Sequence, residues 1–176
     1  MINIVELSHK ILNEFPNPNI AIDMTAGNGY DSLFLAQIAK KVYSFDIQDA
    51  AINNTLKLLE ENNIQNVSVL KESHDLFDIF VSEDIDLAIY NLGYLPSGNK
   101  DIKTSALIVI NSLEKAIEHL NINGIIVIVV YLHNHDESLK ISNFAKKLDS
   151  KFDVMKYEVI NKEQSPYIIK ISRIKK

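Results

Sequence analysis

Residues 20–31 read Ile-Ala-Ile-Asp-Met-Thr-Ala-Gly-Asn-Gly-Tyr-Asp. The apolar run at 20–22 predicts a short buried strand that ends before a turn of small residues, and residues 32–39 follow with the pattern of a helix. A strand, a tight glycine turn and a helix form the first unit of a Rossmann-like fold, in which a ligand lies against bare backbone. The turn carries only Gly27 and Gly29 of the dinucleotide fingerprint, so it does not by itself specify a nucleotide.

Length and composition set the limits on the class of protein. The 176 residues suit one domain, spanning 1–176, with a sizeable core, and the absence of cysteine excludes disulfides and thiolate chemistry. No histidine pair has zinc spacing with a third ligand, so we expect no metal. The net charge of -5 argues mildly against broad nonspecific nucleic-acid binding. Residues 1–14 read as an amphipathic helix, and no apolar run spans a bilayer, so we expect a cytoplasmic protein without membrane contact.

Helical and strand patterns alternate along the chain. We expect helices at 3–14, 32–39, 50–62, 104–120 and 138–149, strands at 20–22, 41–46, 66–71, 85–90, 125–131, 152–160 and 167–174, and a turn at 121–124. The alternation predicts an α/β fold, a mostly parallel sheet with helices on both faces. The last two strands have no helix between them, which predicts a seven-stranded sheet with an antiparallel last strand, as in class I S-adenosylmethionine methyltransferases.

Four polar residues, Asp23, Asp46, His74 and Asn91, each follow a predicted strand. Ligands of doubly wound sheets bind at this edge. Asp46 is placed to accept hydrogen bonds from two ribose hydroxyls of an adenosine cofactor, which we favour over a role as a helix N-cap. Asp23 either caps the turn or holds the ligand's amino group through water, and His74 either contacts adenine or is a loop histidine. We interpret His9, in the first helix, as a surface or lid-side histidine rather than a ligand.

The sequence Asn91-Leu92-Gly93-Tyr94 follows the fourth strand. Amino-methylating enzymes carry an Asn/Asp-Pro-Pro-Tyr/Phe motif there, whose asparagine and backbone carbonyl accept hydrogen bonds from the target amine. Methyl transfer to a neutral amine depends mainly on alignment and desolvation, and a general base is optional. We therefore prefer a catalytic site at Asn91 and Tyr94 to an ordinary loop.

Three blocks of sequence resemble a known family. Residues 23–32 (DMTAGNGYDS) resemble its DATAGNGxDT block, residues 45–48 (FDIQ) its FDIQ block, and residues 90–100 (YNLGYLPSGNK) its FNLGYLPGGDK block. These are signatures of the MnmM (YtqB-like) methyltransferases, long labelled as rRNA methylases, and the resemblance runs over nearly the whole chain. It implies S-adenosylmethionine-dependent methylation of the 5-aminomethyl group of 2-thiouridine at the tRNA wobble position, which gives 5-methylaminomethyl-2-thiouridine.

The resemblance also implies a set of site residues. The implied cofactor-binding residues are Asp23, Thr25, Gly27, Asn28, Gly29, Asp31, Asp46, Gln48, His74 and Asn91. The implied catalytic residues are Asn91 and Tyr94, and the implied substrate contacts are Tyr94, Pro96, Lys100, Tyr131 and His133. The family usually has Y-x-G-H after the fifth strand, where this chain reads Tyr-Leu-His-Asn-His, so His133 and His135 both stay candidates for that histidine.

A tRNA partner needs cations that contact phosphates. The candidates are Lys100, Lys103, Lys170, Arg173, Lys175 and Lys176. The tail from residue 170 onward is either an RNA contact or a solvated terminus. Tyr94 and Tyr131 either stack on a splayed anticodon base or pack at the sheet edge. Because the basic surface is small, and because the resemblance implies it, we expect a homodimer that binds the tRNA anticodon stem-loop.

Two other functions stay open on the residues alone. The chain is either a methyltransferase for rRNA or a small-molecule amine, or a non-catalytic nucleotide-binding or RNA-binding module. A nicotinamide dehydrogenase fits less well because the turn lacks G-x-G-x-x-G.

Overall fold

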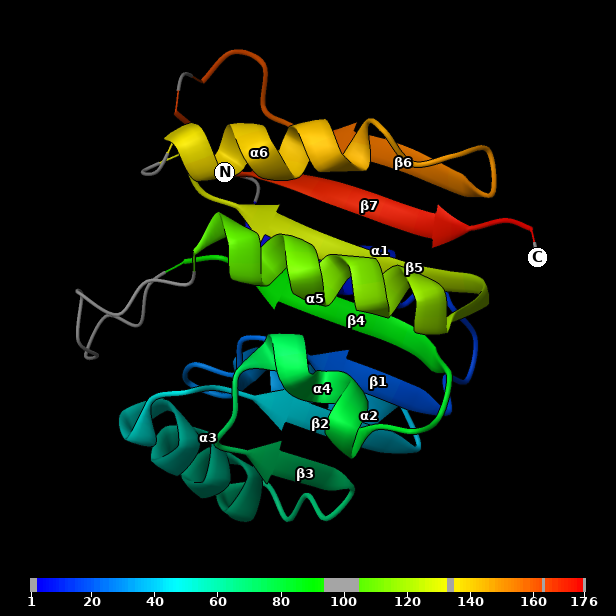
Figure 1. Cartoon of the computed structure of the whole chain (residues 1–176). Helices are drawn as coiled ribbons and strands as arrows, with labels where there is room; N and C mark the ends of the chain where they lie inside the picture. Colours follow the sequence, from blue (N-terminus) through cyan, green and yellow to red (C-terminus); the bar gives the residue numbers. More distant parts are fainter. Residues whose placement is uncertain (1–2, 94–104, 133–134, 163, 176) are drawn as a thin grey trace.

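The centre of the molecule is a seven-stranded sheet in the order β3-β2-β1-β4-β5-β7-β6 (Figure 1). A computed structural model describes residues 3–93, 105–132, 135–162 and 164–175. The strands are β1 (Ile20–Asp23), β2 (Lys41–Phe45), β3 (Val67–Leu70), β4 (Ile85–Asn91), β5 (Leu120–Val130), β6 (Phe152–Tyr157) and β7 (Tyr167–Arg173). Strands β1 to β5 pair in parallel, and β7 lies antiparallel between β5 and β6. The predicted mostly parallel sheet with an antiparallel last strand is confirmed.

Helices cover both faces of this sheet. They are α1 (Ile4–Leu12), α2 (Tyr30–Ile38), α3 (Asp49–Glu61), α4 (Phe77–Phe80), α5 (Ala106–His119) and α6 (His135–Ala145), with a 3-10 turn, η1 (His74–Leu76), before α4. In Figure 1, α4, α5 and α6 lie in front of the sheet, and α1 and α2 lie behind it. None of the described helices combines the length and the apolar character that crossing a membrane requires.

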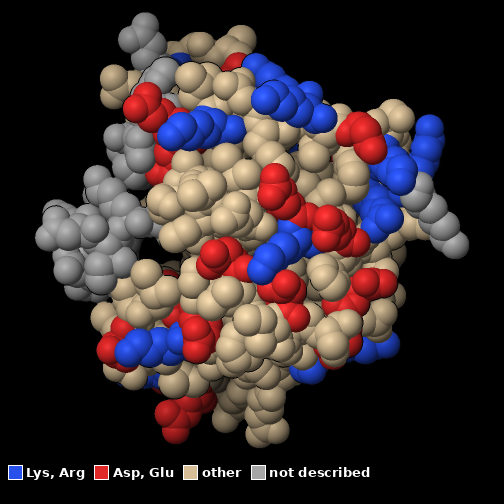
Figure 2. Space-filling model, in the orientation of Figure 1, with Lys and Arg blue, Asp and Glu red and all other residues tan. Residues whose placement is uncertain are grey.

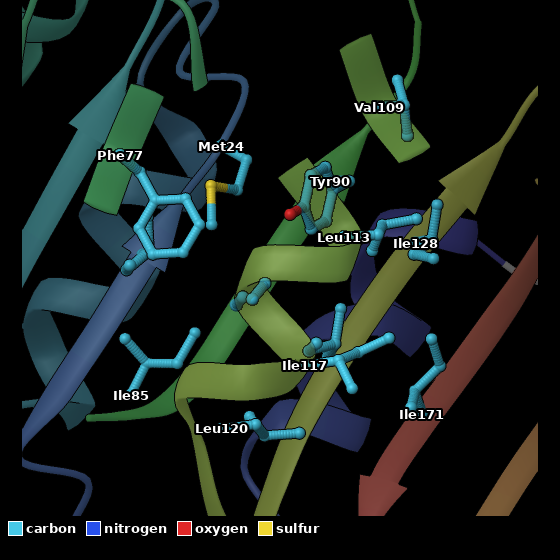
Figure 3. Packing of buried hydrophobic residues seen from close by; sticks show 14 of the residues in the cluster. Met24, Phe77, Ile85, Tyr90, Val109, Leu113, Ile117, Leu120, Ile128 and Ile171 are labelled. Carbon is cyan, nitrogen blue, oxygen red and sulfur yellow. The ribbon is translucent and has the colours of Figure 1, made fainter. Parts of the chain in front are cut away.

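Two apolar layers hold the helices to the sheet. In front, Leu113 and Ile117 of α5 pack toward Ile128 of β5, and Phe77 of α4 lies beside Met24 (Figure 3). Behind, side chains of α1 and α2 pack on the other face of β1, β4 and β5. Residues 124–130 of β5 are all buried, as expected for a strand covered on both faces. Each of these large apolar side chains contributes about 1.5–3 kcal/mol by burial.

The predicted turn at 121–124 lies inside β5, so its assignment as a break before the strand was wrong. The pairing of β4 with β5 runs from Ile85–Leu120 to Leu87–Ile125, and the intervening residues of β5 form an irregularity in the ladder. Asn123 has a positive φ of 66° there, which is the local turn geometry that the sequence indicated. The strand pairing resumes at once because the apolar residues that follow are buried between the two helix layers.

Residues 74–80 form η1 and α4, in a segment for which the sequence predicted no helix or strand. These elements are too short to show helical periodicity, and they form because the fully buried Phe77 anchors them to the core. Helix α6 begins at His135 and ends at Ala145, earlier at both ends than the predicted range 138–149.

Candidate active site

The carboxyl ends of β1 to β5 point to one edge of the sheet (Figure 1), and the glycine turn after β1 lies there. Gly27 and Gly29 have positive φ angles of 53° and 84°. A Cβ on Gly29 would lie 2.8 Å from the Cα of Thr55 in α3, so a side chain does not fit. The Thr55 hydroxyl donates to the Gly27 carbonyl at 3.4 Å, and Asn54 Nδ2 donates to Asn28 Oδ1 at 2.9 Å. Helix α3 therefore fixes the shape of the turn.

Asp23 ends β1 and is completely buried. Its carboxylate accepts hydrogen bonds from the Thr25 backbone N–H at 3.0 Å and from the Ser32 hydroxyl at 2.6 Å. Burial, and then the nearby Asp31 carboxylate, raise the pKa of Asp23 to about 7. Of the two alternatives left open by the sequence, turn capping is the one for which the structure provides contacts.

Asp46, directly after β2, connects the glycine turn to the start of α3. One carboxylate oxygen accepts from the Gly27 N–H and the other from the Gln48 N–H, both at 3.0 Å. The N-cap residue of α3 is Gln48, so the alternative of Asp46 as the helix N-cap was wrong. A carboxylate has about four acceptor positions and two are used here, so this half-buried group has the capacity to accept ribose hydroxyls as well.

His74 is buried, and both of its ring nitrogens lack a hydrogen-bond partner among the described residues. Its ring meets Tyr90 edge-on, with the centroids 5.6 Å apart. Burial lowers the pKa of His74 to about 4, against an effect of Asp75 in the other direction, so the ring is neutral at pH 7. A buried polar ring without a partner destabilises the fold, and it therefore calls for a ligand or a water at this position.

A buried hydroxyl pair, which the sequence did not indicate, holds His74 in place. The Tyr90 and Ser112 hydroxyls lie 2.8 Å apart, and Ser112 donates to the His74 carbonyl at 3.1 Å. Burial raises the pKa of Tyr90, so its hydroxyl stays protonated. The pair ties α5 and β4 to η1. No sequence signal identifies it, because a serine inside a helix gains a partner only when the helix is docked on the sheet.

Asn91 ends β4 and contacts two elements of the site. Its backbone N–H donates to Thr25 Oγ1 of the glycine turn at 2.8 Å, and its Nδ2 donates to Asp31 Oδ2 at 3.1 Å. His9 Nε2 lies 2.6 Å from the other oxygen, Asp31 Oδ1. The His9 ring stacks on Phe34 of α2 with the centroids 3.9 Å apart. His9, which the sequence analysis interpreted as a surface or lid-side histidine, is partly buried where α1 packs on α2 and contacts Asp31 of this site.

Tyr131 follows β5 and lies beside Gly93. A Cβ on Gly93 would lie 3.4 Å from the tyrosine ring, so Gly93 and Tyr131 are packed together. Burial, and then the Asp31 charge, raise the pKa of Tyr131. The other predicted substrate residues, Tyr94, Pro96, Lys100 and His133, lie outside the described residues. The predicted cofactor residues all lie in the described part, at the edge formed by the glycine turn and the ends of β2 and β4.

Two of the cations proposed for phosphate contacts are occupied within the fold. Lys170 forms an ion pair with Glu14 and is mostly buried, and Arg173 Nη1 donates to the Leu120 carbonyl at 2.6 Å. β7 lies inside the sheet between β5 and β6, so these two residues are not part of a solvated tail, and their role as RNA contacts stays a prediction. On the face in Figure 2, Lys and Arg lie interspersed with Asp and Glu, so charges of one sign do not dominate it.

The site residues fit an adenosine cofactor. The half-buried Asp46 retains acceptor capacity beside the glycine turn, and His74 offers ring nitrogens that lack a protein partner among the described residues. These residues lie at the ends of neighbouring strands, where doubly wound folds bind nucleotides.

Comparisons with known proteins agree with this geometry. The family model described as "Putative rRNA methylase" matches residues 42–173. The chain is 38% identical to a structure from Streptococcus mutans described as "SMU.1697c, a putative methyltransferase" in complex with SAH, over 99% of both chains and with a TM-score of 0.94. It is 35% identical to a "putative rRNA-methylase" from Clostridium thermocellum, over 99% of both chains and with a TM-score of 0.95.

A relative of named activity lies further away in sequence. It is the Arabidopsis thaliana "tRNA (mnm(5)s(2)U34)-methyltransferase, chloroplastic", which is 27% identical over 183 residues, covering 93% of this chain and 67% of that protein. The family match extends over most of the sheet. The two bacterial structures match 99% of this chain. The chain belongs to the rRNA methylase family and is an S-adenosylmethionine-dependent methyltransferase.

Proposed function

We propose that this methyltransferase acts on the 5-aminomethyl group of 2-thiouridine at the tRNA wobble position and produces 5-methylaminomethyl-2-thiouridine. The observation that carries the proposal is the bond from the Asn91 N–H to Thr25 Oγ1 at 2.8 Å. This bond holds Asn91, for which we propose the amine-binding role, directly against the glycine turn. The name of the Arabidopsis relative supports an aminomethyl uridine as the substrate.

The proposed chemistry is an in-line displacement. S-adenosylmethionine supplies a methyl carbon bound to a positively charged sulfur. The lone pair of the neutral amine attacks this carbon, a C–N bond forms, and the C–S bond breaks with its electron pair left on the sulfur. The new secondary ammonium then releases a proton to water. Asn91 orients the amine by accepting a hydrogen bond from its N–H, and such alignment supplies much of the rate.

The cofactor would be held by residues already described. The cofactor would lie against the glycine turn, where Asp46 would accept its ribose hydroxyls and His74 would contact its adenine. Asp23 supports the turn through its bond with the Thr25 N–H.

The experiment has a cellular arm and a purified arm. Mass spectrometry of wobble nucleosides from cells that lack the protein should show accumulation of 5-aminomethyl-2-thiouridine. The purified protein should transfer a labelled methyl group to an anticodon stem-loop that carries this nucleoside, but not to one that carries the methylated product. Absence of transfer to this stem-loop would overturn the proposal.

A second candidate substrate is rRNA, which the description of the matched family favours. Incubation with labelled S-adenosylmethionine and separate tRNA, rRNA and metabolite pools distinguishes the candidates. Label in rRNA alone would replace the tRNA proposal, and label in the metabolite pool would indicate a small-molecule amine.

A further inference from the structure

We propose that Asp31 and His9 are positioning residues, which hold the Asn91 side chain with its amide oxygen toward the acceptor amine. The inference rests on the proposed function, because it concerns how that amine is oriented. Neither residue is assigned a contact with the reacting atoms.

The orientation of Asn91 follows from the chemistry of its partner. A carboxylate only accepts hydrogen bonds, so the amide that lies 3.1 Å from Asp31 Oδ2 must present its NH₂ group to it. The amide oxygen then faces away from Asp31, and in the described part of the chain no hydrogen bond to this oxygen is found. An asparagine without such a partner can rotate by 180° and offer either end. Asp31 therefore decides which atom the amine meets.

His9 holds Asp31 from the opposite side. Its Nε2 donates to Asp31 Oδ1 at 2.6 Å, and its ring lies flat on Phe34, with an interplanar angle of 3°. The side chains of His9 and Asp31 are only 22% and 7% exposed, so water competes little for this bond. Exposed ion pairs contribute little, whereas a shielded, charge-assisted bond restricts geometry. The three residues link α1, the first turn of α2 and the end of β4.

The first test is Asp31→Asn. His9 donates to residue 31, so the new amide presents its oxygen to His9 and its NH₂ group to Asn91. The Asn91 side chain must then rotate so that its amide oxygen accepts a hydrogen bond from this NH₂ group. The NH₂ group of Asn91 then meets the amine, which cannot accept a hydrogen bond while its lone pair attacks. We expect kcat to fall about 10- to 100-fold, while the KM for the stem-loop changes less than about threefold.

Asp86→Asn is the matched control. Asp86 is buried and accepts from Asn121 Nδ2 at 2.8 Å, so it makes the same kind of bond at the opposite end of β4. This substitution should leave kcat within about twofold of the wild type, because rotation of Asn121 there affects no reacting group.

The second test exchanges the two groups. Asn91→Asp alone brings two carboxylates together and should lose activity. Adding Asp31→Asn restores a donor facing an acceptor, with a carboxylate oxygen toward the amine, so kcat of the double variant should recover at least about tenfold over Asn91→Asp. A purely structural role for Asp31 predicts no such recovery.

The third test does not depend on the folding of the Asp31 variants. His9→Ala should lower kcat about 3- to 10-fold, and His9→Gln, whose amide can replace the Nε2 donor, should recover part of it. His119→Ala, which removes a histidine packed on Phe77 on the other face of the sheet, is the control.

The outcomes separate two failures. If the wild type methylates the stem-loop and Asp31→Asn keeps the kcat of Asp86→Asn, the positioning role is wrong and the proposed function stands. If Asp31→Asn does not fold, equal kcat values for His9→Ala and the wild type overturn the role. If the wild type transfers no methyl group to this substrate, both proposals fall together.

Discussion

A carboxylate that accepts a hydrogen bond from an asparagine side chain lies at each end of β4, but the two pairs differ in how many of their polar atoms have partners. At the start, the Asp86 carboxylate accepts hydrogen bonds from the Asn19 and Ile20 N–H groups and from Asn121, so it has partners on both oxygens. At the end, Asn91 donates to Asp31, and its amide oxygen has no hydrogen-bond partner among the residues that the structure describes. The amino edge of the sheet is built for stability, and the carboxyl edge leaves binding capacity unused.

Two other polar groups near the carboxyl end of β4 also distinguish it from the amino end. Near Asn91, Asp23 has a raised pKa and His74 lacks a hydrogen-bond partner among the described residues. Both features reduce the stability of the folded chain, and such features gather where a ligand binds. Substitutions at the amino edge should therefore change stability alone, and those at the carboxyl edge should change activity or even raise stability.

The largest effect should come from Asn91→Ala, which removes the proposed amine acceptor. We expect kcat for methyl transfer to fall about 100- to 1,000-fold, with cofactor affinity within about threefold of the wild type. Single-turnover assays with a labelled cofactor, together with calorimetric binding of S-adenosylhomocysteine, measure both. Asn121→Ala at the other end of β4 is the control and should keep its kcat. Full turnover by Asn91→Ala would show that the carboxyl end of β4 has no greater role in catalysis than its amino end.

Asp86→Ala should have the next largest effect, and on stability alone. It leaves the N–H groups of Asn19 and of the buried Ile20 without their acceptor, so the free energy of unfolding should fall by about 2–4 kcal/mol. Urea denaturation measures this change, and kcat per folded molecule should be unaltered. A stability equal to that of the wild type would contradict the structural role of the amino edge.

Asp23→Asn tests whether the carboxyl edge reduces stability. The pKa of Asp23 rises from 3.8 to about 7 on folding, so its protonation favours the folded state. That contribution is complete below about pH 4 and is lost as the pH rises through 7. The neutral asparagine removes this loss, and the variant should exceed the wild type at pH 7.5 by on the order of 2 kcal/mol. The measurement is urea denaturation of the ligand-free proteins from pH 4 to 8. A stability difference between the variant and the wild type that does not vary with pH would contradict the expected effect of the Asp23 pKa.

His74→Phe should give the smallest change, and of the opposite pH dependence. The pKa of His74 falls from 6.5 to about 4 on folding, so the wild type loses stability as the pH decreases through this range. The variant lacks that loss and should be more stable at pH 5 by about 1–2 kcal/mol. If His74 contacts adenine, affinity for S-adenosylhomocysteine should also fall about tenfold. Unchanged affinity would make His74 a structural residue.

The strands, helices and glycine turn follow from local patterns, so the sequence was sufficient to predict them. Period-3.6 and continuous apolar runs reveal what each segment can bury, and polar residues after each strand reveal the ligand edge. The elements it missed, η1 and α4, are too short for periodicity to appear. At residues 121–124 the sequence indicated the local turn geometry correctly. It did not indicate that β5 continues through this turn, which the long-range pairing of β5 with β4 and β7 decides.

By itself, the sequence determined the fold class and placed Asp23, Asp46, His74 and Asn91 at one edge of the sheet. Only the tertiary structure decided what these groups do to one another. The bond between His9 and Asp31 joins residues on two helices, and the ion pair between Lys170 and Glu14 joins β7 to the residues that follow α1. Such contacts depend on how the helices pack and how the strands are ordered. A local sequence pattern does not contain the information about which distant side chains meet.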